Sequence, residues 1–342
     1  MSTLEIGLDT FGDRTRAPSG ELASHAQVIR NLVEQAELAD RVGLAFIGVG
    51  EHHRDDFAVS APEVVLAAIA ARTQRIHLGS AVTVLSSDDP VRVFQRFSTL
   101  DAISNGRAEV ILGRGSFTES FPLFGLDLGR YEQLFDEKLA RFAEVRKGED
   151  RRVYPPIENG LLRTWIGVGG SPESVVRAAR YGFDLMLAII GGDPHRFVPY
   201  VELYGETLKQ FGFGSRPIGV HAPGHVAETD ELAREQLWPH FLEQRTKIGA
   251  ERGWAPPTRA QFDREAGPRG AVFVGSPETV ARKIAAAART LSLSRFDLKY
   301  SNGPMPHEQL LQSIELIGTR VAPRVEELLA AEPAPTVSLS KP

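Results

Sequence analysis

The 342-residue chain carries 39 basic and 44 acidic residues, a formal net charge of -5, and 42% hydrophobic residues. Because charge is nearly balanced and no basic run occurs, nucleic acid and anionic membrane surfaces are disfavoured as partners. The absence of cysteine excludes disulfides, thiol nucleophiles and cysteine metal ligands. No secretory signal pattern and no window of ~18 apolar residues occur, so we expect a cytoplasmic protein that does not enter a membrane.

Strand-like and helix-like patterns alternate along the first half of the chain. Short runs of apolar and β-branched residues predict strands at 4–11, 44–50, 76–85 and 108–112. Longer segments with one apolar face predict helices at 25–42, 61–73, 90–104 and 131–146.

The second half repeats the alternation. Strands are predicted at 165–168, 183–190, 218–226 and 296–300. Helices are predicted at 172–181, 195–211, 229–248, 277–290 and 307–329. Eight strands separated by helices favour an α/β fold of the (β/α)8 TIM barrel type, with insertions, over an open doubly wound sheet.

Two segments lack clear periodicity. Residues 249–270 combine prolines and mixed charge, so we interpret them as an insertion or lid. Residues 331–342 are rich in Pro and Ser and are interpreted as a flexible tail. We therefore expect one barrel domain over residues 1–330.

Three titratable residues, Glu51, His52 and His53, follow the apolar run at 44–50. Adjacent histidines on an extended chain point to opposite faces, so a shared metal is disfavoured and no metal site is predicted. A hydrogen-bonded structural role suits at least one of the two. The functional interpretation is that one imidazole enters the barrel mouth as a proton donor or acceptor, tuned near neutral pH by the neighbouring carboxylate.

Two glycine-rich turns could bind an anion. The strand at 108–112 is followed by Gly113, Arg114, Gly115 and Ser116, and a guanidinium can bind two oxygens of a phosphate or carboxylate. The strand at 165–168 is followed by a turn at 169–174 whose free amides precede a helix. Each has a plainer interpretation, a rim salt bridge for the first and a capped helix for the second. Together they predict one phosphate site on neighbouring strands.

The order and spacing of these motifs resemble the bacterial luciferase-like flavin-dependent monooxygenases over nearly the whole chain. The motifs are Glu51-His52-His53, Leu78-Gly79-Ser80-Ala81-Val82, Gly113-Arg114-Gly115, Gly170-Ser171-Pro172-Glu173-Ser174 and Val274-Gly275-Ser276-Pro277-Glu278. The resemblance implies that His52 is the catalytic base and that Ala81 and Val82 form a non-prolyl cis peptide beneath the flavin ring. It further implies that the cofactor phosphate is bound by Arg114, Ser116, Gly170, Ser171 and Ser174.

The activity that the resemblance implies is monooxygenation of a small organic substrate by reduced FMN and O2 through a flavin hydroperoxide. The protein would supply a dry pocket and a base. Because the chain has no nicotinamide fingerprint, reduced flavin would come from a separate NAD(P)H:flavin reductase. A homodimer formed through early helices, such as the one beginning at Pro62, is also implied. Phe117, Phe121, Leu123 and Phe124 are candidates for the substrate side or for ordinary loop anchors.

Other functions stay open on the sequence alone. The same barrel hosts deazaflavin-dependent oxidoreductases that transfer hydride. A non-catalytic flavin-binding subunit is a second alternative, although the presence of both His52 and Arg114 argues against it. A hydrolase would require a metal cluster, which the sequence does not suggest. The identity of the organic substrate is not predicted.

Overall fold

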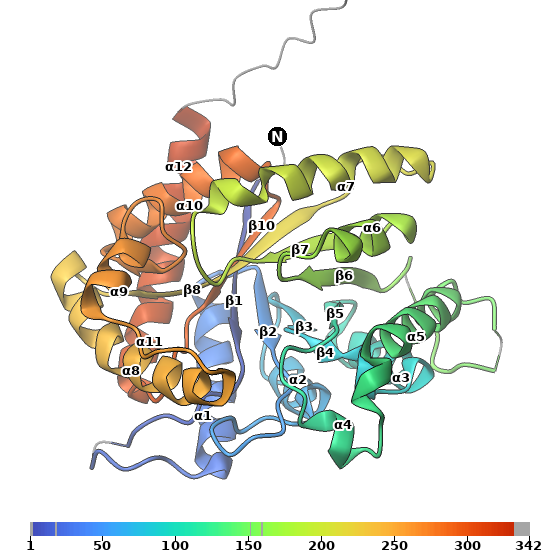
Figure 1. The fold of residues 1–342 in the computed structure, drawn as a ribbon, viewed down its shortest axis with the longest axis horizontal. Coiled ribbons are helices and arrows are strands. Elements are labelled where there is room, and N and C mark those ends of the chain that lie inside the picture. The colour runs from blue at the N-terminus through green and yellow to red at the C-terminus, as the bar shows by residue number, and fades with distance from the viewer. Residues whose placement is uncertain (1–2, 18, 151, 159, 332–342) are drawn as a thin grey trace, which may run out of the picture.

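The computed structural model describes residues 3–331 apart from 18, 151 and 159. Its central strands are β1 (Glu5–Thr10), β2 (Phe46–Val49), β3 (His77–Ser80), β5 (Ala108–Gly113), β6 (Arg163–Val168), β7 (Asp184–Ala188), β8 (Ile218–Val226) and β10 (Arg295–Lys299). These eight strands are parallel, and β10 pairs with both β8 and β1, which closes the sheet (Figure 1). The short strands β4 (Thr83–Val84) and β9 (Phe273–Gly275) pair with β5 and β8. The predicted (β/α)8 barrel is confirmed.

Helices surround the barrel and pack apolar faces on its outer surface (Figure 1). They are α1 (His25–Arg41), α2 (Pro62–Ala70), α3 (Pro90–Ser104), α4 (Ser120–Leu123), α5 (Tyr131–Arg146), α6 (Pro172–Arg180), α7 (Val198–Gln210), α8 (Asp230–Arg252), α9 (Arg259–Ala266), α10 (Pro277–Leu291), α11 (His307–Leu316) and α12 (Ala322–Ala331). Asp89, Ser171 and Ser276 cap α3, α6 and α10 by accepting hydrogen bonds from free amides. A proline follows each cap, where its missing N–H costs nothing.

Two predicted elements are interrupted. The predicted strand at 76–85 is divided into β3 and β4 by a cis peptide bond between Ala81 and Val82. The predicted helix at 307–329 is divided into α11 and α12 by a π-helical turn, Ile317–Val321. Pro323, in the first turn of α12, has no N–H to continue the α-helical hydrogen bonds, which accounts for the second interruption.

The segment 249–270 is more regular than expected. Helix α8 continues to Arg252, and α9 begins at a capping box formed by Thr258 and Gln261. Helix α9 buries only Phe262 and Ala266, so its apolar residues are too few to show a period in the sequence. Its role as a lid stays a prediction. The predicted tail begins at Ala331, the last residue of α12, and its remainder lies outside the described residues. Among the helices that are described, none is both long and apolar enough to cross a membrane.

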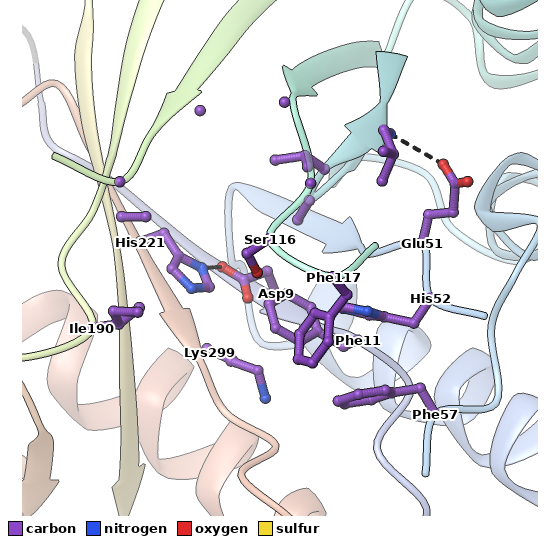
Figure 2. Close-up of a pocket in the computed structure, with 18 of the residues that line it drawn as sticks. Asp9, Phe11, Glu51, His52, Phe57, Ser116, Phe117, Ile190, His221 and Lys299 are labelled. Atoms are coloured by element: carbon purple, nitrogen blue, oxygen red, sulfur yellow. Dashed lines mark hydrogen bonds and ion pairs between the residues drawn. The ribbon is translucent and has the colours of Figure 1, made fainter. Parts of the chain in front are cut away.

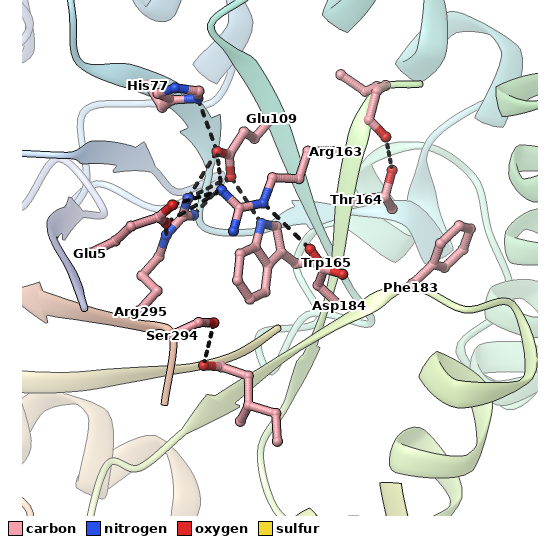
Figure 3. A network of polar contacts seen from close by, with 12 residues as sticks. Glu5, His77, Glu109, Arg163, Thr164, Trp165, Phe183, Asp184, Ser294 and Arg295 are labelled. Carbon is pink, nitrogen blue, oxygen red and sulfur yellow. Dashed lines mark hydrogen bonds and ion pairs between the residues drawn. The ribbon is translucent and has the colours of Figure 1, made fainter. Parts of the chain in front are cut away.

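The two ends of the barrel differ in character. The carboxyl ends of the strands surround an open cavity (Figure 2), whereas the amino ends hold a buried polar network (Figure 3). In this network Arg295 Nη1 and Nη2 lie 2.8 and 2.9 Å from the carboxylate oxygens of Glu109. Glu109 also accepts a hydrogen bond of 2.9 Å from the indole of Trp165. Burial alone would raise the pKa of Glu109, but the Arg295 charge holds that pKa well below its usual range.

The Glu109–Arg295 ion pair should be needed for the stability of the barrel. Both side chains are only 1% exposed, and removing one partner of a buried ion pair leaves the other charge poorly compensated. We expect Arg295→Met to lower the free energy of unfolding by about 3–5 kcal/mol, measured by urea denaturation. As a control, Arg152→Met removes an arginine that is 88% exposed and pairs with Asp150, and it should leave the free energy of unfolding nearly unchanged. Equal losses in the two variants would contradict this role.

Candidate active site

A cavity of about 400 Å³ opens at the carboxyl ends of the strands. Its walls come from the ends of the barrel strands, from the loops that follow them and from the carboxyl-terminal part of α8. This is the end at which (β/α)8 barrels place their active sites, because the loops there vary while the strands fix their positions. Most of the lining surface is apolar, so the cavity suits an organic ligand.

His52 lies among three phenylalanine rings at one side of the cavity (Figure 2). Its ring centroid is 4.3 Å from Phe57, 4.7 Å from Phe11 and 5.0 Å from Phe117. Burial in this setting lowers the pKa of His52 to about 3. Within the described part of the chain, the ring of His52 makes no hydrogen bond. The imidazole is therefore neutral near pH 7, and its ring nitrogens are free to bond a ligand.

Glu51 pairs with His53 rather than with His52. Its Oε1 is 2.9 Å from His53 Nε2 and its Oε2 accepts a hydrogen bond of 3.1 Å from the Val84 amide. Burial raises the pKa of Glu51. The expectation that this carboxylate tunes His52 near neutral pH is therefore wrong. Residues two apart in an extended chain share a side, so Glu51 and His53 together attach the loop after β2 to β4, and His52 alone joins the aromatic rings.

Ala81 and Val82 line the cavity, and the peptide bond between them is cis, as the resemblance implies. Glycines on the neighbouring strands leave room for them. A Cβ on Gly48 would lie 2.8 Å from Ala81 Cβ, and one on Gly113 would lie 2.5 Å from Val82 Cγ2. Any larger residue at either position would have to displace this segment. Val82 also packs on a small apolar cluster inside the barrel that contains Ile111 and Met186.

A corner with two arginines, Arg114 and Arg177, and two acids, Glu132 and Asp136, lies where β5 and β6 end. Arg114 is paired with Glu132 of α5, and the other oxygen of Glu132 lies 2.8 Å from Arg177 of α6. Arg177 also reaches Ser174 Oγ at 3.4 Å, and Ser171 caps the same helix. The structure therefore brings Arg114 and the start of α6 together, as the sequence analysis predicted from the two glycine-rich turns. Arg177 is an addition that the sequence analysis missed, although it lies one helical turn after Ser174.

Hydrogen bonds to the backbone carbonyl groups of Ser116 and Gly170 hold these two residues in position. The carbonyl of Ser116 accepts a hydrogen bond of 3.1 Å from Arg252 of α8. The carbonyl of Gly170 accepts one of 2.9 Å from the hydroxyl of Tyr200, and Gly170 has a φ of 115°, which favours glycine. The hydroxyl groups of both Ser116 and Ser171 remain candidates for a cofactor contact.

A second polar group, missed by the sequence analysis, lies beside Phe11 (Figure 2). His221 Nδ1 is 2.6 Å from Asp9 Oδ2, and the imidazole stacks at 6.0 Å on the ring of Phe11. Lys299 lies 4.6 Å from the same ring and pairs with Asp13 at 3.0 Å. The sequence did contain a signal for these residues. Each is a polar residue inside an otherwise apolar strand, and such a residue must either have a polar partner or line a cavity.

Asp297 also lines the cavity, at its buried end. Within the described structure neither of its carboxyl oxygens has a hydrogen-bond partner. Burial raises the pKa of Asp297 well above its usual range. As for metals, no group of three or more His, Asp or Glu side chains in the described ranges is arranged to hold one.

Comparison with known proteins connects this site to a family. The model of the luciferase-like monooxygenases matches residues 11–294. N-acetyl-S-alkylcysteine monooxygenase of Bacillus subtilis is 30% identical over 222 residues, which is 61% of this chain and 63% of that protein. The chain thus spans less than two thirds of the length of this curated relative.

Solved structures share the fold. The oxygenating constituent of 3,6-diketocamphane monooxygenase of Pseudomonas putida, in complex with FMN, superposes with a TM-score of 0.76 at 18% identity, covering 95% of this chain and 99% of that one. The coenzyme F420-dependent tetrahydromethanopterin reductase of Methanopyrus kandleri gives a TM-score of 0.66 at 16% identity, covering 95% and 100%. At these identities the likeness establishes the barrel fold alone.

The low pKa of His52 should make the protein sensitive to acid. Its pKa falls from 6.5 in the unfolded chain to about 3 in the fold, so between these values the unfolded chain binds more protons. Stability is therefore lost as pH falls through that window. We expect the contribution of His52 to the free energy of unfolding to drop by about 2 kcal/mol between about pH 7.5 and pH 5.

Urea denaturation at both pH values checks this expectation. His52→Gln should reduce the pH dependence of stability by about 1–2 kcal/mol, because glutamine does not titrate. His25→Gln, at an exposed position on α1, should leave that dependence unchanged. An unaltered pH dependence in His52→Gln would show that the His52 ring is already solvated in the fold.

Proposed function

The chain belongs to the luciferase-like monooxygenase family, and from this premise we propose that it uses reduced FMN and O2 to oxygenate a small organic substrate. The observation that carries the proposal is the combination of an apolar cavity, lined by Ala81 and Val82, with a corner beside it that holds Arg114 and Arg177. An aromatic ring system joined to a phosphate would require both features.

The residues present fit FMN. Arg114 and Arg177 offer two guanidinium groups, and the start of α6 offers free amides and the hydroxyl groups of Ser171 and Ser174. These donors suit a phosphate. Glu132, which pairs with both arginines, and Asp136, which also pairs with Arg177, are 54% and 53% exposed, so these ion pairs are weak and a doubly charged phosphate can replace them. Ser116 and Gly170 border the same corner and complete the proposed cofactor site.

Bound reduced flavin would supply the electrons that activate O2, and the protein would control what surrounds it. Phe11, Phe57 and Phe117 exclude water from one side of the cavity. A dry cavity limits wasteful loss of reactive oxygen species from the site. His52 is the proposed proton acceptor, since its neutral ring has no competing hydrogen bond among the described residues.

The proposal includes two partners. A separate NAD(P)H:flavin reductase would supply reduced flavin. A second copy of the chain would pack on early helices, where Val64 of α2 leaves 71% of its surface exposed. The alternatives are a deazaflavin-dependent oxidoreductase that transfers hydride, supported by the shared fold of the coenzyme F420-dependent reductase, and a non-catalytic flavin-binding subunit.

Anaerobic titration with reduced FMN, followed by rapid mixing with O2, tests the function. We expect a dissociation constant of about 1 μM or lower, and a delay in the return of oxidised-flavin absorbance relative to free reduced FMN. Tight binding of a deazaflavin with no binding of FMN in either redox state would favour hydride transfer instead. Binding without any delay would favour the non-catalytic subunit.

Replacing Arg114 tests the position of the cofactor phosphate. We expect Arg114→Gln to weaken FMN binding by about 10- to 100-fold, because a charge-assisted bond to the phosphate is lost. Riboflavin, which has no phosphate, should bind the variant and the wild type equally. Arg130→Gln removes a nearby exposed arginine that pairs with Glu137 instead, and it should bind FMN like the wild type. An equal loss for riboflavin would show that Arg114 acts through the fold of the loop.

A further inference from the structure

Most of the charged side chains that line the cavity have a polar partner within the protein. Among the acids, Asp9 pairs with His221, Glu51 with His53, and Glu119 with Arg54 at 2.7 Å. Neither carboxyl oxygen of Asp297 has a hydrogen-bond partner among the described residues, and burial raises its pKa. Of the cations, Arg114 pairs with Glu132 and Lys299 with Asp13. Apart from Asp297, each of these groups has a polar partner within the protein.

Two lining arginines, Arg245 and Arg252 of α8, are different. In the part of the chain that the structure describes, neither has a carboxylate within ion-pair distance. Arg245 packs on the ring of Phe241 at 5.1 Å and donates one hydrogen bond of 3.1 Å to the carbonyl of Ile190. Arg252 donates to the carbonyl of Ser116 and packs on the ring of Phe117 at 4.8 Å. The two lining arginines without an ion-pair partner among the described residues therefore lie on one helix, α8.

Arg245 is the more constrained of the two. It is half-buried, and burial lowers its pKa, yet a guanidinium keeps its charge in any protein. A desolvated charge without a partner is costly. A guanidinium has five N–H donors. In Arg245 only one of the five donates to the carbonyl of Ile190, so the others can bind a carboxylate through two hydrogen bonds.

This cation is separate from the corner that suits the cofactor phosphate. The corner lies at the ends of β5 and β6 and is built on α5 and α6. Arg245 comes from α8 and contacts the residue that follows β7 by two positions. An anion bound by Arg245 is therefore a second anionic group, in addition to the phosphate.

The apolar lining indicates what such an anion would be attached to. The cavity that Arg245 borders also contains the rings of Phe11, Phe57 and Phe117 and the side chains of Ile190 and Ile248. We propose that the substrate is an organic acid, whose carboxylate is bound by Arg245 and whose apolar part lies against these rings. This inference deepens the proposed function, because it names the substrate class, and Arg252 attracts the same anion from the cavity mouth.

Calorimetric binding of matched probes tests the inference without turnover. The probes are ω-phenylalkanoates, such as 4-phenylbutyrate, and the corresponding neutral amides, measured on the full chain with oxidised FMN present and absent. We expect the acids to bind the wild type at least about tenfold more tightly than the amides. In Arg245→Gln this preference should disappear, and in Arg245→Lys it should be partly kept, because charge remains but the two-pronged geometry is lost.

Lys247→Gln is the control, since it removes a positive charge from the same helix that pairs outside the cavity with Asp55. It should keep the preference for acids. Equal binding of acids and amides by the wild type, or binding of neither up to about 10 mM, would overturn the inference. So would a loss of FMN binding in Arg245→Gln with the preference for acids unchanged, which would assign Arg245 to the cofactor. Failure of the proposed function is seen separately, as an absence of FMN binding or of the delayed reoxidation.

Discussion

Closure of the barrel around the ion pair of Glu109 and Arg295 is the constraint on which the rest of the structure depends. Eight parallel strands enclose an interior that side chains must fill. At the amino ends the filling is polar, with Arg295 lying over the rings of Phe46 and Trp165 at 4.3 and 4.6 Å. These large groups complete the packing of that end. The free volume of the interior is left at the carboxyl ends, where the cavity opens.

The same packing determines how closely a ligand can approach the backbone that lines the cavity. Val82 rests on the apolar cluster above Trp165, and Gly48 and Gly113 allow the neighbouring strands to approach the Ala81–Val82 segment. The cavity wall around Ala81 and Val82 is therefore made of backbone and small side chains, while Phe11, Phe57 and Phe117 make another part of the wall aromatic. A flat ligand can approach such a surface closely, and the stiff strands below keep the surface from moving.

Much of the fold is readable from periodicity. The helices at 90–104 and 131–146 and the strand at 218–226 have the bounds that the apolar pattern predicted. The interruption at Ala81 and Val82 is not readable in this way, because both residues suit a continuous strand. Only the resemblance to a family implied it. Helix α9 was missed because it buries just two residues.

The site was readable in part, and the limits have physical causes. Turns that end strands gave His52, Arg114 and the start of α6, because strand ends meet at one face of a barrel. The sequence analysis did not specify which imidazole the carboxylate of Glu51 contacts, although the alternation of an extended chain places Glu51 beside His53. His221 was missed because its partner, Asp9, is 212 residues away along the chain. No local pattern can report such a contact.

The role proposed for Arg245 cannot be predicted from the sequence, and only the structure shows the surroundings on which it depends. In the sequence it is one of several charged residues on a long polar helix, where arginines usually face solvent. Its importance comes from its surroundings, which only the folded chain reveals, because Arg245 lines the cavity and has no ion-pair partner among the described residues. An arginine placed in this way favours anions and disfavours cations of the same shape. Selectivity of this kind resides in the sum of the charges around the cavity rather than in any one motif.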